Sequence, residues 1–337
     1  MATTYTEENV EEYNQARELT RQGAKFTDAQ AEEAERELAA QPDNLASRTR
    51  LLGYYGKRQF SKNADNSARN AHIFWLVANR PDSPLAGMPE AGIHSPLDSD
   101  AYAQAKALWL EQTARQPENG AVLTAAARFF THTDPDIADE LLGKALALEP
   151  DNAMWAFQRG YLASLELIRG PKSARVAQAQ AALELFRQAL ALAPEEHWRS
   201  MMLQQAAKMA FAAQQFDEAK QYADELLAYG LSRPRKDMGD ELHHSNMILG
   251  RLALHFGRVA EAKSYLLAAG DVAGSPPLDS FGPNMELAKE LLEVGEKETV
   301  LQYLDLCAEF WKRAKLQEWR AQIERGETPD FGGNLNY

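Results

Sequence analysis

Small residues at helical spacing on both sides of a central glycine make 241–270 the most constrained stretch of the chain. Gly250 lies on one face of its first half, and Ala262 lies on one face of its second half. Small side chains on both elements let two helix backbones approach closely, so we expect an antiparallel helical hairpin. Gly257, between the two halves, suits the left-handed conformation that commonly ends a helix. The stretch therefore predicts a helix–turn–helix unit.

Comparable units follow one another from residue 119 onward. We expect them at 119–152, 200–233, 243–276 and 281–314, with one longer unit over 153–194. The sequence shows no alternation of period two that is sustained enough to predict a strand. The spacing of Leu249, Gly250, Gly257, Ala262 and Ala269 resembles the tetratricopeptide repeat, a helix–turn–helix unit of about 34 residues. The resemblance implies an all-α fold, a right-handed α-solenoid of about seven antiparallel helix pairs.

The N-terminal part departs from this repeat but keeps a helical pattern. Residues 1–26 are expected to form an acidic helical extension, and residues 27–118 are expected to form degenerate helix pairs. Thr27 and Gln30 have the spacing of a capping box, so they predict a helix that starts here and runs to about Ala40.

Two segments lack periodicity. The loop 80–100 contains four prolines and two glycines, which forbid a regular element. Loops of this length are often functional, and the alternative is an ordered crossover packed over the repeats. At the other end, residues 315–325 are expected to form a capping helix that covers the last repeat. Residues 326–337 are expected to form a loose tail.

Charge and composition exclude several classes of function. The formal net charge is −13. A nucleic-acid binder or a protein that binds an anionic membrane needs a basic face, so we expect neither partner. The N-terminal residues do not resemble a secretory signal, and the single cysteine, Cys307, excludes an internal disulfide. A cytoplasmic location is the simplest interpretation, and Cys307 falls where a small core residue belongs.

Catalytic and metal-binding motifs are not evident, so we expect no enzyme activity, no cofactor and no metal. His243 and His244 follow two acidic residues, which is a composition that can bind a metal ion. Adjacent residues on a helix point about 100° apart, so the pair cannot easily chelate one ion. We expect the two histidines to have structural or groove-lining roles.

A stripe of basic and apolar residues is the most informative feature for function. In tetratricopeptide arrays the first helices of successive repeats line a concave groove that binds extended peptides, and the resemblance implies the same here. Lys208, Arg251 and Lys289 occupy equivalent positions and would form a basic ladder. The predicted partner-binding groove consists of Met201, Gln204, Lys208, Phe211, His244, Met247, Arg251, Met285 and Lys289. The alternative is that these charges are solvated helix residues.

The stripe predicts a non-enzymatic scaffold that binds a protein or peptide partner with acidic segments. One alternative is an enzyme or a small-ligand-binding protein with a site in the concavity near His243 and His244. Another is a structural assembly protein that self-associates. The oligomeric state stays open on the sequence.

Overall fold

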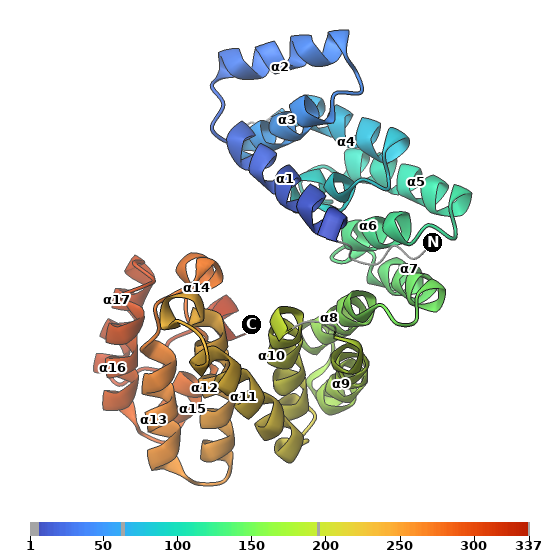
Figure 1. The fold of residues 1–337 in the computed structure, drawn as a ribbon. Coiled ribbons are helices and arrows are strands. Elements are labelled where there is room, and N and C mark those ends of the chain that lie inside the picture. The colour runs from blue at the N-terminus through green and yellow to red at the C-terminus, as the bar shows by residue number, and fades with distance from the viewer. Residues whose placement is uncertain (1–6, 62–64, 194–195, 336–337) are drawn as a thin grey trace. The chain divides into compact units, whose positions relative to one another are not determined.

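The computed structural model of the chain describes residues 7–61, 65–193 and 196–335. Within these ranges the regular elements are helices, with no strand, so the all-α prediction is confirmed (Figure 1). The chain divides into two compact units, residues 1–155 and 156–337. The boundary falls inside a single helix, α8 (Ala153–Arg169), and not between residues 118 and 119, where the sequence pattern changes.

The N-terminal unit consists of seven complete helices, two short 3₁₀ turns and the start of α8 in its described part. The elements are α1 (Glu7–Gly23), α2 (Asp28–Ala40), α3 (Leu45–Arg58), α4 (Ser67–Asn79), η1 (Pro84–Gly87), η2 (Pro89–Ala91), α5 (Ser99–Arg115), α6 (Gly120–Phe130) and α7 (Pro135–Leu148). From α2 to α7, each helix packs against the next in the chain, as helical repeats do.

Helix α2 begins as the sequence predicts. The Thr27 hydroxyl accepts a hydrogen bond from the Gln30 N–H at 3.3 Å, and the Gln30 side chain accepts one from the Thr27 N–H at 2.9 Å. This reciprocal pair is a capping box, so two of the unpaired N–H groups at the start of the helix are satisfied.

Helix α1 packs on α3 with direct backbone contact. A Cβ atom added at Gly53 would lie 2.1 Å from the carbonyl oxygen of Thr20. One added at Gly23 would lie 1.8 Å from the carbonyl oxygen of Arg50. Because any larger side chain would prevent this approach, the two glycines fix where the acidic helix docks.

The segment 80–100 is an ordered crossover. It forms the turns η1 and η2 and buries apolar side chains, among them Leu85, Met88 and Ile93. The buried guanidinium of Arg69 on α4 donates to the carbonyl oxygens of Glu90 at 3.0 Å and Gly92 at 2.6 Å. The crossover is therefore held by both apolar burial and hydrogen bonds.

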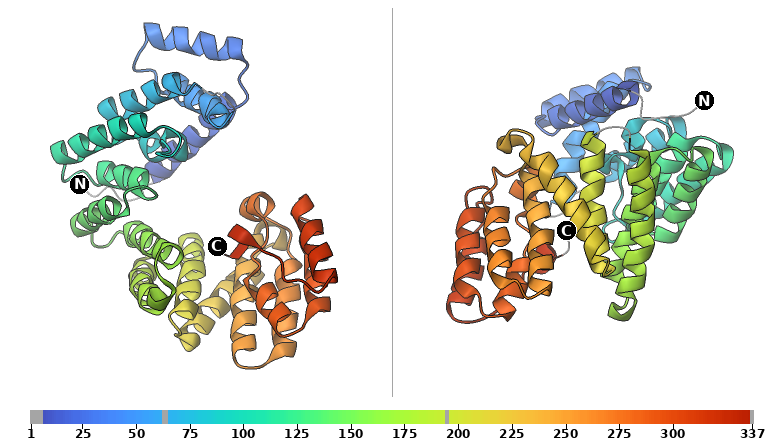
Figure 2. Two further views of the ribbon diagram at one scale, coloured as in Figure 1. Left: turned by 180° about the vertical axis from the view of Figure 1, so that it is seen from behind. Right: turned by 60° about the horizontal axis from the view of Figure 1, so that its bottom comes forward.

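The C-terminal unit continues the pairing of consecutive helices. After α8 it contains η3 (Lys172–Ala174), α9 (Arg175–Leu192), α10 (Glu196–Ala212), α11 (Phe216–Leu231), η4 (Arg235–Asp237), α12 (Gly239–His255), α13 (Val259–Gly270), α14 (Pro276–Phe281), α15 (Glu286–Glu293), α16 (Lys297–Cys307), α17 (Ala314–Glu324) and η5 (Gly332–Leu335). Figure 2 shows α13, α16 and α17 side by side, and their buried faces share one apolar core.

The hairpin of α12 and α13 has the predicted geometry. Gly257 has a φ of 74°, which is the left-handed conformation expected at the turn. A Cβ atom at Gly250 would lie 2.3 Å from Leu287 Cδ2 and 3.0 Å from Tyr265 Cβ. The close approach inferred from small residues is therefore confirmed.

The end of the chain differs from the expected loose tail. Phe331 is 1% exposed and packs against Trp319 of α17, with ring centroids 5.1 Å apart. Asn334 forms hydrogen bonds to the segment between α14 and α15. One aromatic residue and one amide thus anchor a segment whose composition alone favours disorder.

Candidate functional site

A cavity of about 490 Å³ lies within the C-terminal unit. Its walls come mainly from α8, α10 and α12, which are the first helices of successive pairs, with contributions from α15 and the tail. Such a surface is where the repeat pattern places a binding groove. A concave site with apolar walls and a few polar groups is the usual form of a ligand site.

Four of the nine predicted groove residues line this cavity: Gln204, Lys208, Phe211 and Arg251. The other five lie elsewhere. His244 and the methionines Met247 and Met285 are buried, and both methionines belong to the apolar core. Met201 and Lys289 are half-buried but are not part of the cavity wall.

The third member of the predicted ladder, Lys289, does not line the cavity. The predicted stripe treats 282–292 as one continuous helix, but α15 starts at Glu286 and Met285 is its N-cap. Glu286, the first residue of α15, lines the cavity, and Lys289 does not. An acidic residue therefore occupies the place expected for a base.

Arg251 is neutralised within the chain. Its guanidinium forms ion pairs with Glu286 at 3.0 Å and with Glu290 at 2.7 Å. It also stacks over the Phe211 ring, 4.4 Å from the centroid. The side chain is 15% exposed, so this ion pair is shielded from water. Arg251 is already satisfied by two carboxylates and organises the wall of the cavity.

Lys208 also lines the cavity, and it differs from Arg251 in its partners. Within the described residues its ammonium group makes no hydrogen bond and no ion pair. Burial lowers the pKa of Lys208, nearby Glu286 opposes this effect, and Arg251 adds to it. The side chain is half-buried, so an anion entering the cavity would find there a cationic donor that no described residue neutralises.

Asn284 holds Glu286 in place. The Asn284 side-chain oxygen accepts a hydrogen bond from the Glu286 N–H at 2.8 Å, and the Tyr303 hydroxyl donates to the Asn284 carbonyl at 2.7 Å. The Asn284 N–H donates to His243 Nε2 at 3.1 Å. The carboxylate that faces Arg251 is thus fixed through a buried network.

Both ring nitrogens of His243 are occupied by the backbone. Nδ1–H donates to the Ala269 carbonyl at 2.8 Å, because a carbonyl can only accept, and Nε2 accepts from Asn284. The ring is therefore the neutral tautomer, and burial lowers its pKa to about 4. His243 has a structural role, which agrees with the favoured sequence interpretation. In the part of the chain that the structure describes, no histidine, cysteine and carboxylate cluster could hold a metal ion.

Apolar side chains complete the cavity. Tyr161 and Ile168 of α8 line it and are 41% and 52% exposed. Phe216 and His255 also line the cavity, and their ring centroids lie 4.1 Å apart. These residues offer contact area to the apolar part of a ligand, beside the ammonium of Lys208. The sequence singled out none of the four, because they come from three helices, α8, α11 and α12, whose proximity depends on the packing.

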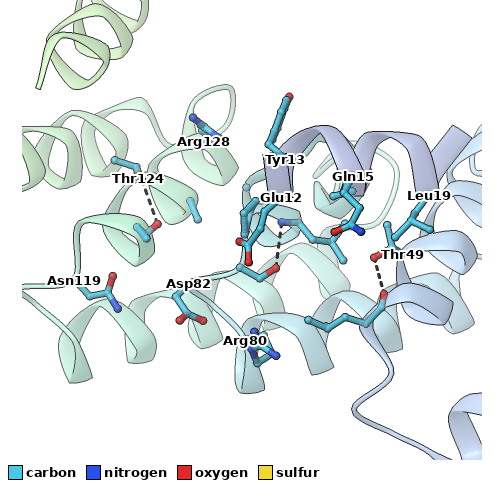
Figure 3. A pocket seen from close by; sticks show the side chains of 18 of the residues that line it. Glu12, Tyr13, Gln15, Leu19, Thr49, Arg80, Asp82, Asn119, Thr124 and Arg128 are labelled. Carbon is cyan, nitrogen blue, oxygen red and sulfur yellow. Dashed lines mark hydrogen bonds between the residues drawn. The ribbon is translucent and has the colours of Figure 1, made fainter. Parts of the chain in front are cut away.

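A second cavity, of about 570 Å³, lies within the N-terminal unit (Figure 3). Helices α1, α3 and α6 and the crossover segment form its walls. Its charged residues balance, because the lining contains two carboxylates, Glu12 and Asp82, and two guanidinium groups, Arg80 and Arg128. Since the lining has no net charge and its polar residues are largely at the surface, this cavity favours no class of ligand.

Comparisons with known proteins do not indicate a class of function for this chain. No protein-family model matches the sequence, and a search of curated proteins finds no significant match. Among the described residues, no helix is both long enough and apolar enough to span a membrane.

Proposed function

We propose that this protein is a non-enzymatic scaffold that binds an extended segment of a partner protein in the cavity of the C-terminal unit. The observation that carries the proposal is Lys208, a half-buried cation that lines the cavity and makes no hydrogen bond or ion pair within the described residues. The helix pairs are those of a right-handed, tetratricopeptide-like solenoid of about seven pairs, in which first helices line the binding surface. We place the protein in the cytoplasm.

The charges of the cavity favour an acidic ligand segment. The protein carries a net charge of −13, yet the cavity lining includes Arg175, Lys208 and Arg251 against the single carboxylate of Glu286. Glu286 and Glu290 neutralise Arg251, and Arg175 Nε donates to the Leu167 carbonyl at 3.2 Å. Lys208 is therefore the lining cation that has neither an ion pair nor a hydrogen bond within the described residues. A carboxylate flanked by apolar side chains would satisfy Lys208 and contact Tyr161 and Ile168.

Two lysine variants test the proposal, with a displayed library of extended peptides as the probe. Peptides selected on the wild-type protein should be enriched in acidic residues. Lys208→Met should weaken their binding by about tenfold or more, because a charge-assisted hydrogen bond is lost. The matched control is Lys289→Met, which removes a lysine of the predicted ladder that does not line the cavity, and it should leave affinity nearly unchanged.

The same variants have a second readout. Lys208→Met removes a half-buried charge that forms no ion pair within the described residues and keeps most of the side-chain volume, so the melting temperature should stay nearly the same. Equal losses of affinity in both variants, or no loss in either, would show that the ligand does not depend on Lys208, and the proposed function would be wrong.

A further inference from the structure

The C-terminal segment returns from α17 to the cavity of the same unit. After Gly326 the chain reverses, and Phe331 inserts beside Trp319 in the core. Four residues later, Leu335 forms part of the cavity wall. The segment therefore connects a fixed anchor in the core to the candidate site.

Asn334 binds the segment that precedes the cavity-lining Glu286 through both its backbone and its side chain. Its carbonyl accepts a hydrogen bond from the Met285 N–H at 2.8 Å. Its side-chain amide donates to the carbonyls of Phe281 at 3.1 Å and Pro283 at 2.8 Å. These are the contacts that a bound peptide would make with exposed backbone groups, but here the chain itself supplies them.

The position of this contact links the tail to the charges of the cavity. Met285 is the N-cap of α15 and immediately precedes Glu286, whose carboxylate faces Arg251 and lies near Lys208. Leu335, next to Asn334, packs on the edge of the core and lines the cavity together with Glu286. The tail thus occupies part of the surface that a partner segment would need.

We propose that residues 330–335 are an internal ligand of the cavity, which a partner segment displaces when it binds. This inference rests on the proposed function, because it concerns the regulation of the same site. It also specifies the partner: the competing segment presents an amide side chain followed by an aliphatic residue to the backbone of 281–285. Phe331 stays in the core and keeps the released segment close to the cavity, so the tail competes at a high effective concentration.

The test removes the internal ligand and supplies it as a separate peptide. A variant that ends at Gly333 lacks Asn334 and Leu335 but keeps Phe331. The probe is a labelled peptide of residues 332–337, GGNLNY, and fluorescence anisotropy measures its binding. The shortened variant should bind the probe at least about tenfold more tightly than the full chain, in which the attached tail competes. If the truncation lowers the melting temperature, the same binding measurement is made on a full-length double variant, Asn334→Ala with Leu335→Ala, in place of the shortened variant.

Substitutions in the probe peptide distinguish specific binding from nonspecific adhesion. Replacing its asparagine by alanine removes the amide that binds Phe281 and Pro283, and should weaken binding by about fivefold or more. Replacing its second glycine by alanine is the control and should have little effect. Equal affinity of the full chain and the shortened variant for the probe, or insensitivity to the asparagine change, would overturn the proposal.

The outcome is distinguishable from failure of the proposed function. If the tail competes, the shortened variant should also bind the library-selected acidic peptides more tightly than the full chain, whereas an unchanged affinity contradicts competition. Dependence of those peptides on Lys208 is measured separately. If binding of a peptide depends on Lys208 but does not change when the tail is shortened, the proposed binding site is supported and the internal-ligand proposal is wrong.

Discussion

At the scale of single residues, the buried histidines make stability depend on pH. His243 is fully buried and neutral, with its pKa lowered to about 4 by desolvation. An unfolded histidine has a pKa of about 6.5, so between these values the unfolded chain binds more protons. The stabilisation is therefore complete above about pH 6.5 and is lost as the pH falls toward 4.

The free energy of unfolding should therefore change with pH at a measurable rate. Urea unfolding should show that His243 contributes a loss approaching about 1.4 kcal/mol for each pH unit below 6.5. His243→Asn should be less stable than the wild type at pH 7 but should lose less stability on going to pH 5. The exposed His132→Asn serves as the control. Parallel pH profiles for the His243 variant and the wild type would contradict the assignment.

Cys307 supports a second prediction at this scale. The residue is fully buried in the core of α16, and burial raises the pKa of its thiol. Because thiolate is the reactive form, a thiol reagent should label Cys307 slowly in the native protein and rapidly in denaturant. Cys307→Ala should cost about 1 kcal/mol through a small cavity and leave peptide binding intact. Rapid labelling in the native state would refute the buried-thiol interpretation.

Individual residues also show which structural features can be predicted from the sequence. Gly257 and the capping box at Thr27 depend on neighbours within a few positions, so the sequence predicts them directly. The partners of Arg251 lie more than thirty positions away, at Glu286 and Glu290, and their proximity depends on how α12 and α15 pack. Burial of Phe331 depends equally on tertiary structure, so composition alone predicts a loose tail.

At the scale of elements, the contact between α1 and α3 can be tested with two glycine substitutions in α3, one at the contact and one away from it as the control. Gly53→Ala would place a methyl group on the Thr20 carbonyl and should cost about 1–3 kcal/mol, because the two helices must separate. Gly56, three residues further along α3, has nothing within 4 Å of an added Cβ. Gly56→Ala should instead stabilise the protein by about 0.4–1 kcal/mol.

Thermal unfolding measured by circular dichroism compares the two variants. Melting temperatures that shift in opposite directions support the docking of α1, whereas two equal shifts would mean that α1 does not lie against α3. The sequence predicts α1 as a polar, acidic helix and gives no sign of this contact, because a glycine shows only that space is available and not which backbone fills it.

At the scale of the whole molecule, helix positions were more predictable than the division into units. Most helices fall within a few residues of the expected ranges because periodicity and capping are local properties. The boundary between the two units lies inside α8, where the helix is continuous and composition does not change. Which helix faces share a core is decided by long-range packing, so the site was predicted only for the two central inner helices, α10 and α12.

The bond between Asn334 and Met285 joins positions that leave the ribosome at different times. Roughly fifty residues separate them, which is a delay of a few seconds at about 5–20 residues per second. Helices α8 to α13 are complete before the tail emerges, so most of the cavity wall can form in a nascent chain that does not yet carry its competitor. A partner present during translation would meet that site unopposed, whereas one that arrives later would have to displace Asn334.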